Sequence, residues 1–178
     1  MSDDLEIRRA RVEDIQSLAD LAARSFRDAF AADNDLGTID EYLRTSLTVE
    51  SVRKEFDTAG NFFLLAFRAG VDVPVGYAKL NTATEEPSVK ARNSVEIERL
   101  YADTHAIGHG VGAALMRACL KTAQDLKCDV IWLGSWTKNE RANLFYQRWE
   151  FETVGKRQFA LGSELQDDLV LARQVIKT

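Results

Sequence analysis

A glycine-rich segment, residues 105–116, lies in the chain between a predicted strand and a predicted helix. The helix covers residues 110–126, where apolar side chains recur at helical spacing along one side. The first N–H groups of a helix have no partner within it, and glycine lets a ligand approach the backbone closely. This segment therefore predicts an anion site suited to a phosphate or a diphosphate.

The strand before the glycines covers Ser94–Ala102, where side chains of different character alternate. Simple alternation places Val95, Ile97, Arg99 and Tyr101 on one face, and Glu96, Glu98, Leu100 and Ala102 on the other.

The rest of the chain supplies further strands and helices of a single α/β domain, residues 1–178. Its apolar patterns predict a mixed sheet with helices on both faces. The other predicted strands are 5–10, 62–67, 75–82, 129–136, 152–161 and 169–175, and the other predicted helices are 13–32, 38–47, 49–56 and 139–149. The polar segment 84–93, which contains Pro87, is the best candidate for a mobile loop.

Charge and composition restrict the partners. The chain carries 28 acidic and 23 basic residues, and this net charge of -5 argues against nucleic acid or an anionic membrane as the main partner. It mildly favours a cationic substrate. No run of about 18 apolar residues and no signal-peptide pattern occurs, so we expect a soluble, cytoplasmic protein. The two cysteines, Cys119 and Cys128, lack metal-ligand spacing, so no metal is expected.

The order of the elements and several short motifs resemble the GNAT superfamily of acyl-CoA-dependent N-acetyltransferases. The motifs are the strand end Leu100-Tyr101-Ala102, the turn Gly110-Val111-Gly112, and Asn139, Ala142, Phe145 and Tyr146 further on. Segments 96–101 and 131–140 are similar to the PaiA-type spermidine/spermine N-acetyltransferases. The resemblance spans residues 5–175 and implies a GNAT-like, mixed but mostly antiparallel seven-stranded sheet, splayed between the strand ending at Ala102 and strand 130–136.

The resemblance also implies acetyl-CoA as cosubstrate. The pantetheine arm would enter the splayed gap, pair with backbone at Leu100, Tyr101 and Ala102, and contact Asn139. The diphosphate would lie on the turn formed by Ile107, Gly108, His109, Gly110, Val111, Gly112 and Ala113. Tyr146 would face the thioester sulfur. We expect Arg148 either to reach the phosphates or to form a surface ion pair.

Two positions depart from the family pattern. Ile107 stands where the family usually has arginine or glutamine, which removes a side-chain contact but leaves the backbone N–H donors. Glu150 stands where a glycine usually ends the last helix. Glutamate there would cost about 1 kcal/mol if the backbone adopts the same left-handed conformation, and the alternative is a different helix end.

Tyr146 and two glutamates are the candidate catalytic residues. A phenol with a pKa of about 10 is protonated at pH 7 and can donate to a departing thiolate, although Tyr146 taken alone also fits core packing. Glu96 and Glu98 could bind an ammonium and relay its proton through water, with the pKa of either raised by burial and by its neighbour. Their alternative interpretation is a polar stripe or a set of ion pairs with Arg99 or Lys79.

A dinucleotide-binding turn is a rival interpretation of the glycines. Gly108, Gly110 and Ala113 match the G-x-G-x-x-A fingerprint. However, five residues separate the strand from the first of these glycines, and the next strand ends Gly134-Ser135-Trp136 without the acid that the fingerprint requires. The rival interpretation is therefore disfavoured.

A covalent acyl-enzyme is also disfavoured, because neither Ser135 nor Cys119 has a histidine at motif spacing. His105 and His109 flank the glycines, and we expect His109 at the loop surface near phosphate rather than in a catalytic position.

The sequence therefore predicts an enzyme that moves the acetyl group of acetyl-CoA to a primary amine by direct attack, with a polyamine such as spermidine or spermine as acceptor. We expect a small-molecule partner, no nucleic acid, no membrane, and a monomer or homodimer. Two alternatives stay open: a protein N-terminal or lysine acetyltransferase, and a non-catalytic CoA-binding regulator. The presence of Tyr146 with the glutamate pair argues against the regulator.

Overall fold

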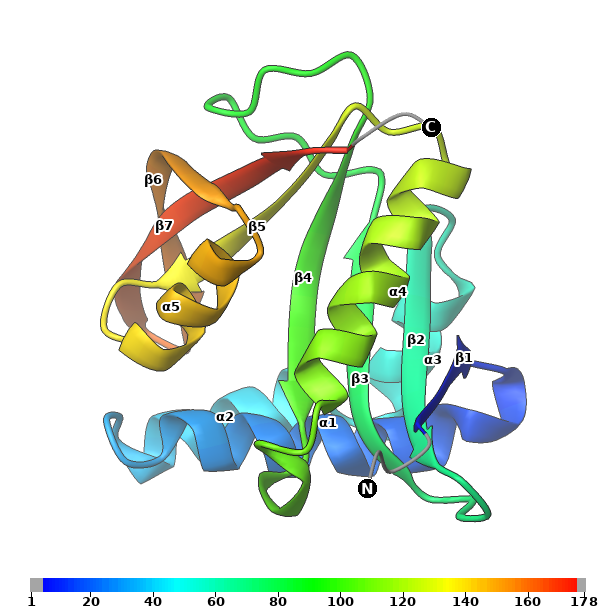
Figure 1. The fold of residues 1–178 in the computed structure, drawn as a ribbon. Helices are drawn as coiled ribbons and strands as arrows, with labels where there is room; N and C mark the ends of the chain where they lie inside the picture. Colours follow the sequence, from blue (N-terminus) through cyan, green and yellow to red (C-terminus); the bar gives the residue numbers. More distant parts are fainter. Residues whose placement is uncertain (1–4, 176–178) are drawn as a thin grey trace.

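Residues 5–175, which the computed structural model describes, form one seven-stranded sheet with helices on both faces (Figure 1). The strands are β1 (Leu5–Arg9), β2 (Asn61–Arg68), β3 (Pro74–Asn81), β4 (Ser94–Ala102), β5 (Val130–Trp136), β6 (Glu152–Leu161) and β7 (Glu164–Gln174). The helices are α1 (Ile15–Phe30), α2 (Leu36–Ser46), α3 (Val49–Asp57), α4 (Val111–Asp125) and α5 (Glu140–Arg148), with short 3-10 helices η1 (Val12–Asp14) and η2 (Thr104–Ala106). The sheet order β1-β2-β3-β4-β5-β7-β6 is antiparallel except for the β4–β5 pair, so the predicted mixed, mostly antiparallel sheet is confirmed.

The two faces of the sheet carry separate hydrophobic cores. Helix α4 packs on one face over Leu64 and Ala66 of β2, and α5 adds side chains to the same core. Helices α1, α2 and α3 cover the other face, over Phe63, Leu65 and Phe67. The run 62–67 is apolar at every position because β2 is covered on both faces, as its sequence predicts.

The sheet divides between β4 and β5. These strands pair over only three positions, the last of which joins Glu96 to Trp132. Beyond that pair β4 continues to Ala102 and β5 to Trp136, and the two diverge (Figure 1). The splayed sheet is therefore present as predicted, and it leaves one edge of β4 without a partner among the described strands.

A β-bulge corrects the predicted faces of β4. Lys79 of β3 pairs with Arg99, whereas the next residue pairs with Ile97, so Glu98 is an extra residue in the ladder. The extra residue reverses the alternation that follows it. Leu100 and Ala102 therefore pack in the α4 core with Val95 and Ile97, while Arg99 and Tyr101 share the opposite face with Glu96.

The start of β7 was also wrong in the sequence prediction. The strand begins at Glu164, five positions before the predicted start at Leu169, and pairs with β6 from Leu161 onward. The reason is that Gln166 and Asp168 are buried polar residues, which hide the apolar alternation typical of a strand.

The segment 84–93 is irregular, as predicted, and connects β3 to β4. Its Val89 packs against Val130, Trp132 and Val170, and its mobility stays a prediction. Among residues 5–175, no helix is long and apolar enough to cross a membrane.

Candidate functional site

The turn between β4 and α4 presents backbone N–H groups in open space. Gly108 and Gly110 have φ of +84° and +82°, the left-handed region that favours glycine. Beyond chain neighbours, no atom lies within 4 Å of a side-chain carbon built at either position. The first hydrogen bond of α4 joins the Ala114 N–H to the Gly110 carbonyl, 2.9 Å, so the N–H groups of residues 111–113 precede helical pairing. This geometry fits a diphosphate.

Side-chain contacts hold this turn on the body of the domain. Asp103 accepts from the His105 N–H at 3.2 Å and from the Arg24 guanidinium of α1 at 2.7 Å. Both His105 and His109 are exposed, in agreement with the surface position expected for His109. Ile107 is 37% exposed and offers no polar side-chain contact, so the predicted anion site would have to use backbone N–H groups here.

The splayed gap opens beside this turn. The side chains of Leu100 and Ala102 pack toward α4. Because β5 pairs with β4 only as far as Glu96, the backbone of this later part of β4 has no strand beside it on the β5 side among the described residues. A side-chain carbon built on Gly112 would lie 3.6 Å from the ring of Phe145, which shows that the start of α4 and helix α5 are in contact. The gap therefore has β4 on one side and α5 on the other, and it fits the predicted path of a pantetheine arm.

Tyr146 lies on α5 among aromatic and apolar side chains. Its ring centroid is 5.4 Å from Phe145 and 5.9 Å from Phe151, both edge to face. Burial, with a smaller contribution from Cys119, raises the pKa of Tyr146 above its ordinary value. Burial and nearby phenols, including that of Tyr146, also raise the pKa of Tyr101. Tyr146 is therefore a protonated phenol at neutral pH, close to both α4 and β4.

The two other predicted α5 residues have simpler surroundings. Asn139 caps the helix, because its Oδ1 accepts from the Ala142 N–H at 3.2 Å, which leaves its amide N–H₂ for a ligand. Arg148 is exposed and forms no ion pair with another described residue, so the surface-pair alternative receives no support. The contacts of both residues with CoA stay predictions.

Helix α5 ends with Glu150 in the left-handed conformation, at φ +63°. The Phe151 N–H bonds to the Tyr146 carbonyl at 3.1 Å and the Glu150 N–H to the Gln147 carbonyl at 2.9 Å, the two bonds of a Schellman motif. The Phe151–Tyr146 ring contact accompanies this motif. The chain therefore bends in a left-handed conformation at Glu150, where the resemblance led us to expect glycine, and this bend fixes the Tyr146 end of the helix.

Glu150→Gly should stabilise the protein by about 1 kcal/mol, because it relieves the strain of a side chain at positive φ. The melting temperature should rise by about 2–4 °C in a scanning calorimeter. The substitution also removes an ion pair between Glu150 and Arg173, 3.2 Å apart. The Glu150 side chain is 79% exposed, so this pair contributes little to stability. Glu150→Ala keeps the strain and removes the same ion pair, so equal melting temperatures for the two variants would show that strain is absent.

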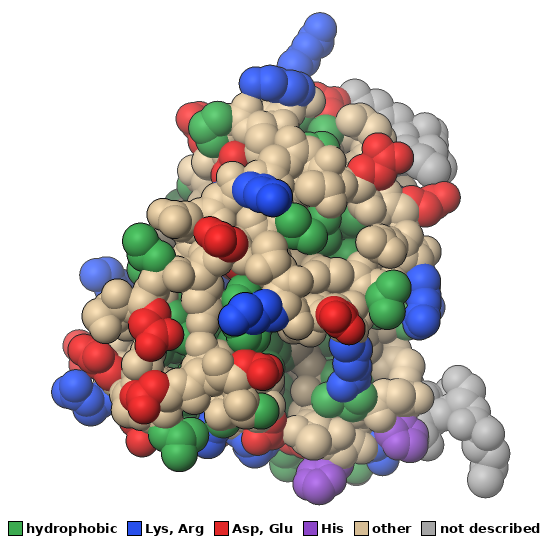
Figure 2. All heavy atoms as spheres, turned by 90° about the vertical axis from the view of Figure 1, so that its left-hand side faces the viewer, with side chains coloured by type: hydrophobic (Ala, Val, Ile, Leu, Met, Phe, Trp, Pro, Cys, Tyr) green, Lys and Arg blue, Asp and Glu red, His purple; other side chains and the backbone are tan. Residues whose placement is uncertain are grey.

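A cleft of about 390 Å³ opens on the sheet face opposite α4. Aromatic side chains form one wall of the cleft. Phe26 stacks on Phe30 and on Tyr42, with ring centroids 4.5 Å apart in each pair, and the ring centroids of Phe30 and Trp136 are 5.9 Å apart. Figure 2 shows that acidic and basic side chains are interspersed on one side of the molecule, with hydrophobic side chains in the hollows between them. The cleft is lined by Phe26, Phe30, Tyr42, Glu96, Glu98, Arg99, Tyr101, Gly134, Trp136, Arg157, Gln158, Phe159, Ala160, Gln166 and Asp168.

Both predicted glutamates line this cleft, but each already has a basic partner. Glu96 is 3% exposed and accepts from the Arg157 guanidinium at 2.9 Å. Burial raises the pKa of Glu96, with Arg157 opposing the shift. Burial would also raise the pKa of Glu98, but hydrogen bonds from Lys79 and Asn81 outweigh it and lower the pKa below its ordinary value. A raised pKa was expected for either glutamate, and for Glu98 that expectation was wrong.

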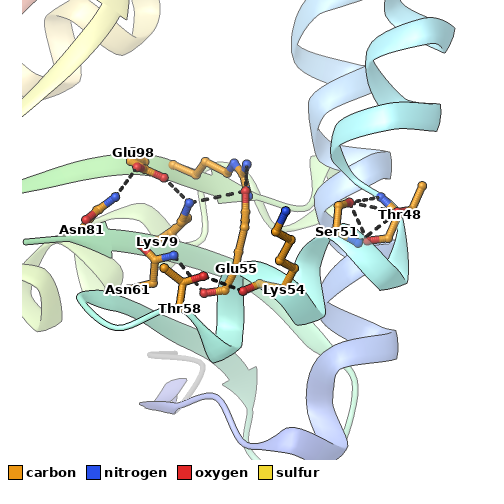
Figure 3. A network of polar contacts seen from close by, with 10 residues as sticks. Thr48, Ser51, Lys54, Glu55, Thr58, Asn61, Lys79, Asn81 and Glu98 are labelled. Carbon is orange, nitrogen blue, oxygen red and sulfur yellow. Dashed lines mark hydrogen bonds and ion pairs between the residues drawn. The ribbon is translucent and has the colours of Figure 1, made fainter. Parts of the chain in front are cut away.

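Glu98 belongs to a network that joins β4, β3 and α3 (Figure 3). Lys79, of which 4% is exposed, is ion-paired with Glu98 and lies 3.4 Å from Glu55. Glu55 also holds Arg99 through two bonds of 2.7 and 2.8 Å. Every charge in this network therefore faces an opposite one, and the ion pair with Lys79 named in the alternative interpretation of Glu98 is present.

The sequence analysis did not identify two further charged residues of the cleft, Arg157 and Asp168. Arg157 reaches from β6 across β5, where a methyl group on Gly134 would collide with its guanidinium. It also lies over the Trp132 ring at 5.3 Å. The available signal was Gly134 in an otherwise apolar strand, since such a glycine often marks the close approach of another group.

No covalent or metal chemistry is indicated by the described residues. Burial raises the pKa of Cys119 to about 12, so its thiol stays protonated at neutral pH. No group of three or more His, Cys, Asp or Glu residues within 5–175 is arranged to hold a metal ion.

Comparisons with known proteins agree with this geometry. The model of the acetyltransferase (GNAT) family matches residues 16–151. An uncharacterized N-acetyltransferase from Lactobacillus delbrueckii subsp. lactis is 27% identical over 165 residues, which cover 92% of this chain and 94% of that protein. A probable spermine N(1)-acetyltransferase from Bacillus subtilis subsp. natto is 29% identical over 86 residues, 48% of this chain and 57% of that protein.

Solved structures share the fold. The PaiA N-acetyltransferase from Thermoplasma acidophilum, solved in complex with coenzyme A, superposes with a TM-score of 0.74 at 19% identity, and the match covers 96% of this chain and 99% of that one.

Proposed function

Because the chain belongs to the GNAT acetyltransferase family, we propose that it transfers an acetyl group from acetyl-CoA to a primary amine of the polyamine class, such as spermidine or spermine. The observation that carries the acceptor assignment is the cleft of about 390 Å³, which combines carboxylates with an aromatic wall. Members of the family use acetyl-CoA, and the donor side of the site fits it.

On the donor side, the chain binds and orients. The N–H groups of the glycine turn would hold the diphosphate, and the free edge of β4 near Tyr101 would pair with the pantetheine arm. Asn139 and Arg148 are proposed to add contacts from α5. When bound, acetyl-CoA supplies a thioester carbonyl that the amine nitrogen attacks directly.

Tyr146 is the proposed general acid. Its phenol is protonated at pH 7, while a thiolate with a pKa near 8.5 leaves without its proton. Because burial raises the phenol's pKa, a free tyrosinate would be unfavourable, so Tyr146 must regain a proton as it donates one. The amine nitrogen, which loses a proton on attack, is the natural source.

On the acceptor side, Glu96 is the better proton relay of the two glutamates. An alkylamine with a pKa of about 10.4 must lose a proton at pH 7, which costs about 4.6 kcal/mol. Burial raises the pKa of Glu96 above its ordinary value, whereas hydrogen bonds from Lys79 and Asn81 lower the pKa of Glu98. Of the two glutamates, Glu96 is therefore the one that could relay this proton through water.

The cleft suits a chain of methylenes and ammonium groups. Three acids line it, Glu96, Glu98 and Asp168, against two bases, Arg99 and Arg157. Aromatic faces contact methylene groups and also attract ammonium ions by cation–π interaction, by about 0.5–2 kcal/mol each. The Bacillus subtilis relative, named as a probable spermine N(1)-acetyltransferase, supports the same acceptor class.

The proposal is tested by measuring CoA release with spermidine, spermine, hexylamine and a lysine-bearing peptide as acceptors. We expect the polyamines to have the highest kcat/KM, and the spermidine KM to rise several-fold from about 0.02 to 0.5 M salt because charge attraction is screened. Hexylamine is the matched control, since it has a similar apolar length but only one cation.

Each contrary outcome identifies a different error. A faster reaction with the peptide would refute the polyamine class and leave the acetyltransferase activity standing. If the protein binds acetyl-CoA but releases no CoA with any amine of the panel, a non-catalytic regulator would be favoured instead.

A further inference from the structure

Asp168 lies at the floor of the acceptor cleft, between two strands that border it. Its β7 position pairs with Trp136 of β5 on one side and with Arg157 of β6 on the other. It is 7% exposed and lines the cleft together with Glu96. An aspartate at such a place is desolvated, so it needs a compensating cation.

Asp168 is the least compensated carboxylate of the cleft. Glu96 has the Arg157 Nη2 at 2.9 Å, and Glu98 has both Lys79 and Asn81. The nearest cationic atom to Asp168 is the Arg157 Nε at 3.9 Å from its Oδ2, which is too long for a hydrogen bond. One guanidinium thus faces two carboxylates and neutralises only one of them. The pair keeps about one negative charge at the cleft floor.

We propose that Asp168, rather than the ion-paired Glu96, binds the ammonium group of the acceptor amine and takes up its first proton before the nitrogen attacks, an inference that rests on the proposed function. In this step an N–H bond of the ammonium breaks, an O–H bond forms on Asp168 directly or through one water, and the freed lone pair attacks the thioester carbonyl. The second proton leaves the nitrogen after attack and replaces the one that Tyr146 gives to the thiolate. Asp168 then returns its proton to solvent.

The titration of Asp168 suits this role. Burial raises the pKa of Asp168 to about 6, with Arg157 opposing the shift and Asp167 and Glu96 adding to it. Compared with an ordinary aspartate, this makes it a roughly 100-fold better proton acceptor while it is still mostly ionised at pH 7. The charged or titratable groups that line the cleft around it are Glu96, Glu98, Arg99 and Tyr101 from β4, Arg157 from β6 and Tyr42 from α2.

The test compares Asp168→Asn with Asp167→Asn, which removes the same charge from the exposed neighbour on the same strand. The assay measures kcat/KM for spermidine, or for the amine of the panel that reacts fastest, between pH 5 and 9. Asp168→Asn should lower this value at least tenfold at pH 7.5 and remove an acidic limb with an apparent pKa of about 6. The acetyl-CoA KM should not change. Asp167→Asn should keep the wild-type rate at pH 7.5 and an acidic limb, which shifts only to lower pH because Asp167 helps to raise the pKa of Asp168.

A binding measurement gives a readout besides turnover. In a calorimetric titration of spermidine into the protein saturated with CoA, Asp168→Asn should bind spermidine at least tenfold more weakly than the wild type. Asp167→Asn should bind it with wild-type affinity. Asp168→Glu keeps a carboxylate and should recover the acidic limb. If Asp168→Asn does not fold by circular dichroism, Asp168→Ser serves for both measurements.

The outcomes separate the two ideas. If the wild type acetylates an amine and the neutral variant keeps both its rate within threefold and its acidic limb, Asp168 has no such role and the proposed function stands. If the wild type binds acetyl-CoA but neither binds spermidine nor acetylates any amine, the proposed function fails and the role of Asp168 fails with it.

Discussion

Tyr146→Phe should lower kcat by about 10²–10⁴-fold and leave the KM for acetyl-CoA nearly unchanged. Phenylalanine keeps the ring contacts with Phe145 and Phe151, so the packing of α5 is preserved. What is lost is the hydroxyl that protonates the leaving thiolate. Steady-state kinetics with saturating amine, followed by CoA release, measures the effect.

Tyr77→Phe is the matched control for this variant. Tyr77 is also a buried tyrosine, and its hydroxyl finds no hydrogen-bond partner among the described residues. Removing an unpaired buried hydroxyl should be neutral or slightly stabilising, with no change in kcat. If Tyr146→Phe stayed within twofold of the wild type, or if both variants lost activity equally, Tyr146 would be a packing residue.

The parts of the fold that were predictable are those in which burial follows a simple period. The run 62–67 is apolar on both faces because cores lie on both sides of β2, and Phe63 and Leu64 point to different cores. The glycine turn was predictable for a different reason: positive φ at Gly108 and Gly110 restricts which residues can occupy those positions. Periodicity and backbone restriction are both local, so a single sequence reveals them.

The parts that were not predictable depend on contacts between distant segments. The bulge at Glu98 depends on how β4 pairs with β3 around Lys79, and the sequence of β4 alone gives no signal of it. Likewise Asp168 has the sequence context of a loop, and only the pairing of β7 with β5 and β6 places it beside Arg157. An alternating strand with polar residues turned into a cleft is indistinguishable from a polar loop by periodicity.

Gly110→Glu should weaken CoA binding at least tenfold, about 1.4 kcal/mol or more, by calorimetric titration. The carboxylate would stand beside the N–H groups that are proposed to hold the diphosphate, and charge repulsion would replace attraction. A side chain at φ +82° also adds strain of about 1–2 kcal/mol, but space is free around the position, so the fold should stay intact by circular dichroism.

Two controls isolate the charge from the strain. Gly110→Ala introduces a side chain at the same φ without a carboxylate, so it should bind CoA more tightly than Gly110→Glu does. Gly70→Glu places the same side chain at another glycine of positive φ, +74°, that also has nothing within 4 Å, and it should bind CoA like the wild type. Unchanged binding by Gly110→Glu would mean that the turn only starts a helix. Equal losses for the alanine and glutamate variants would assign the effect to backbone strain rather than to an anion site.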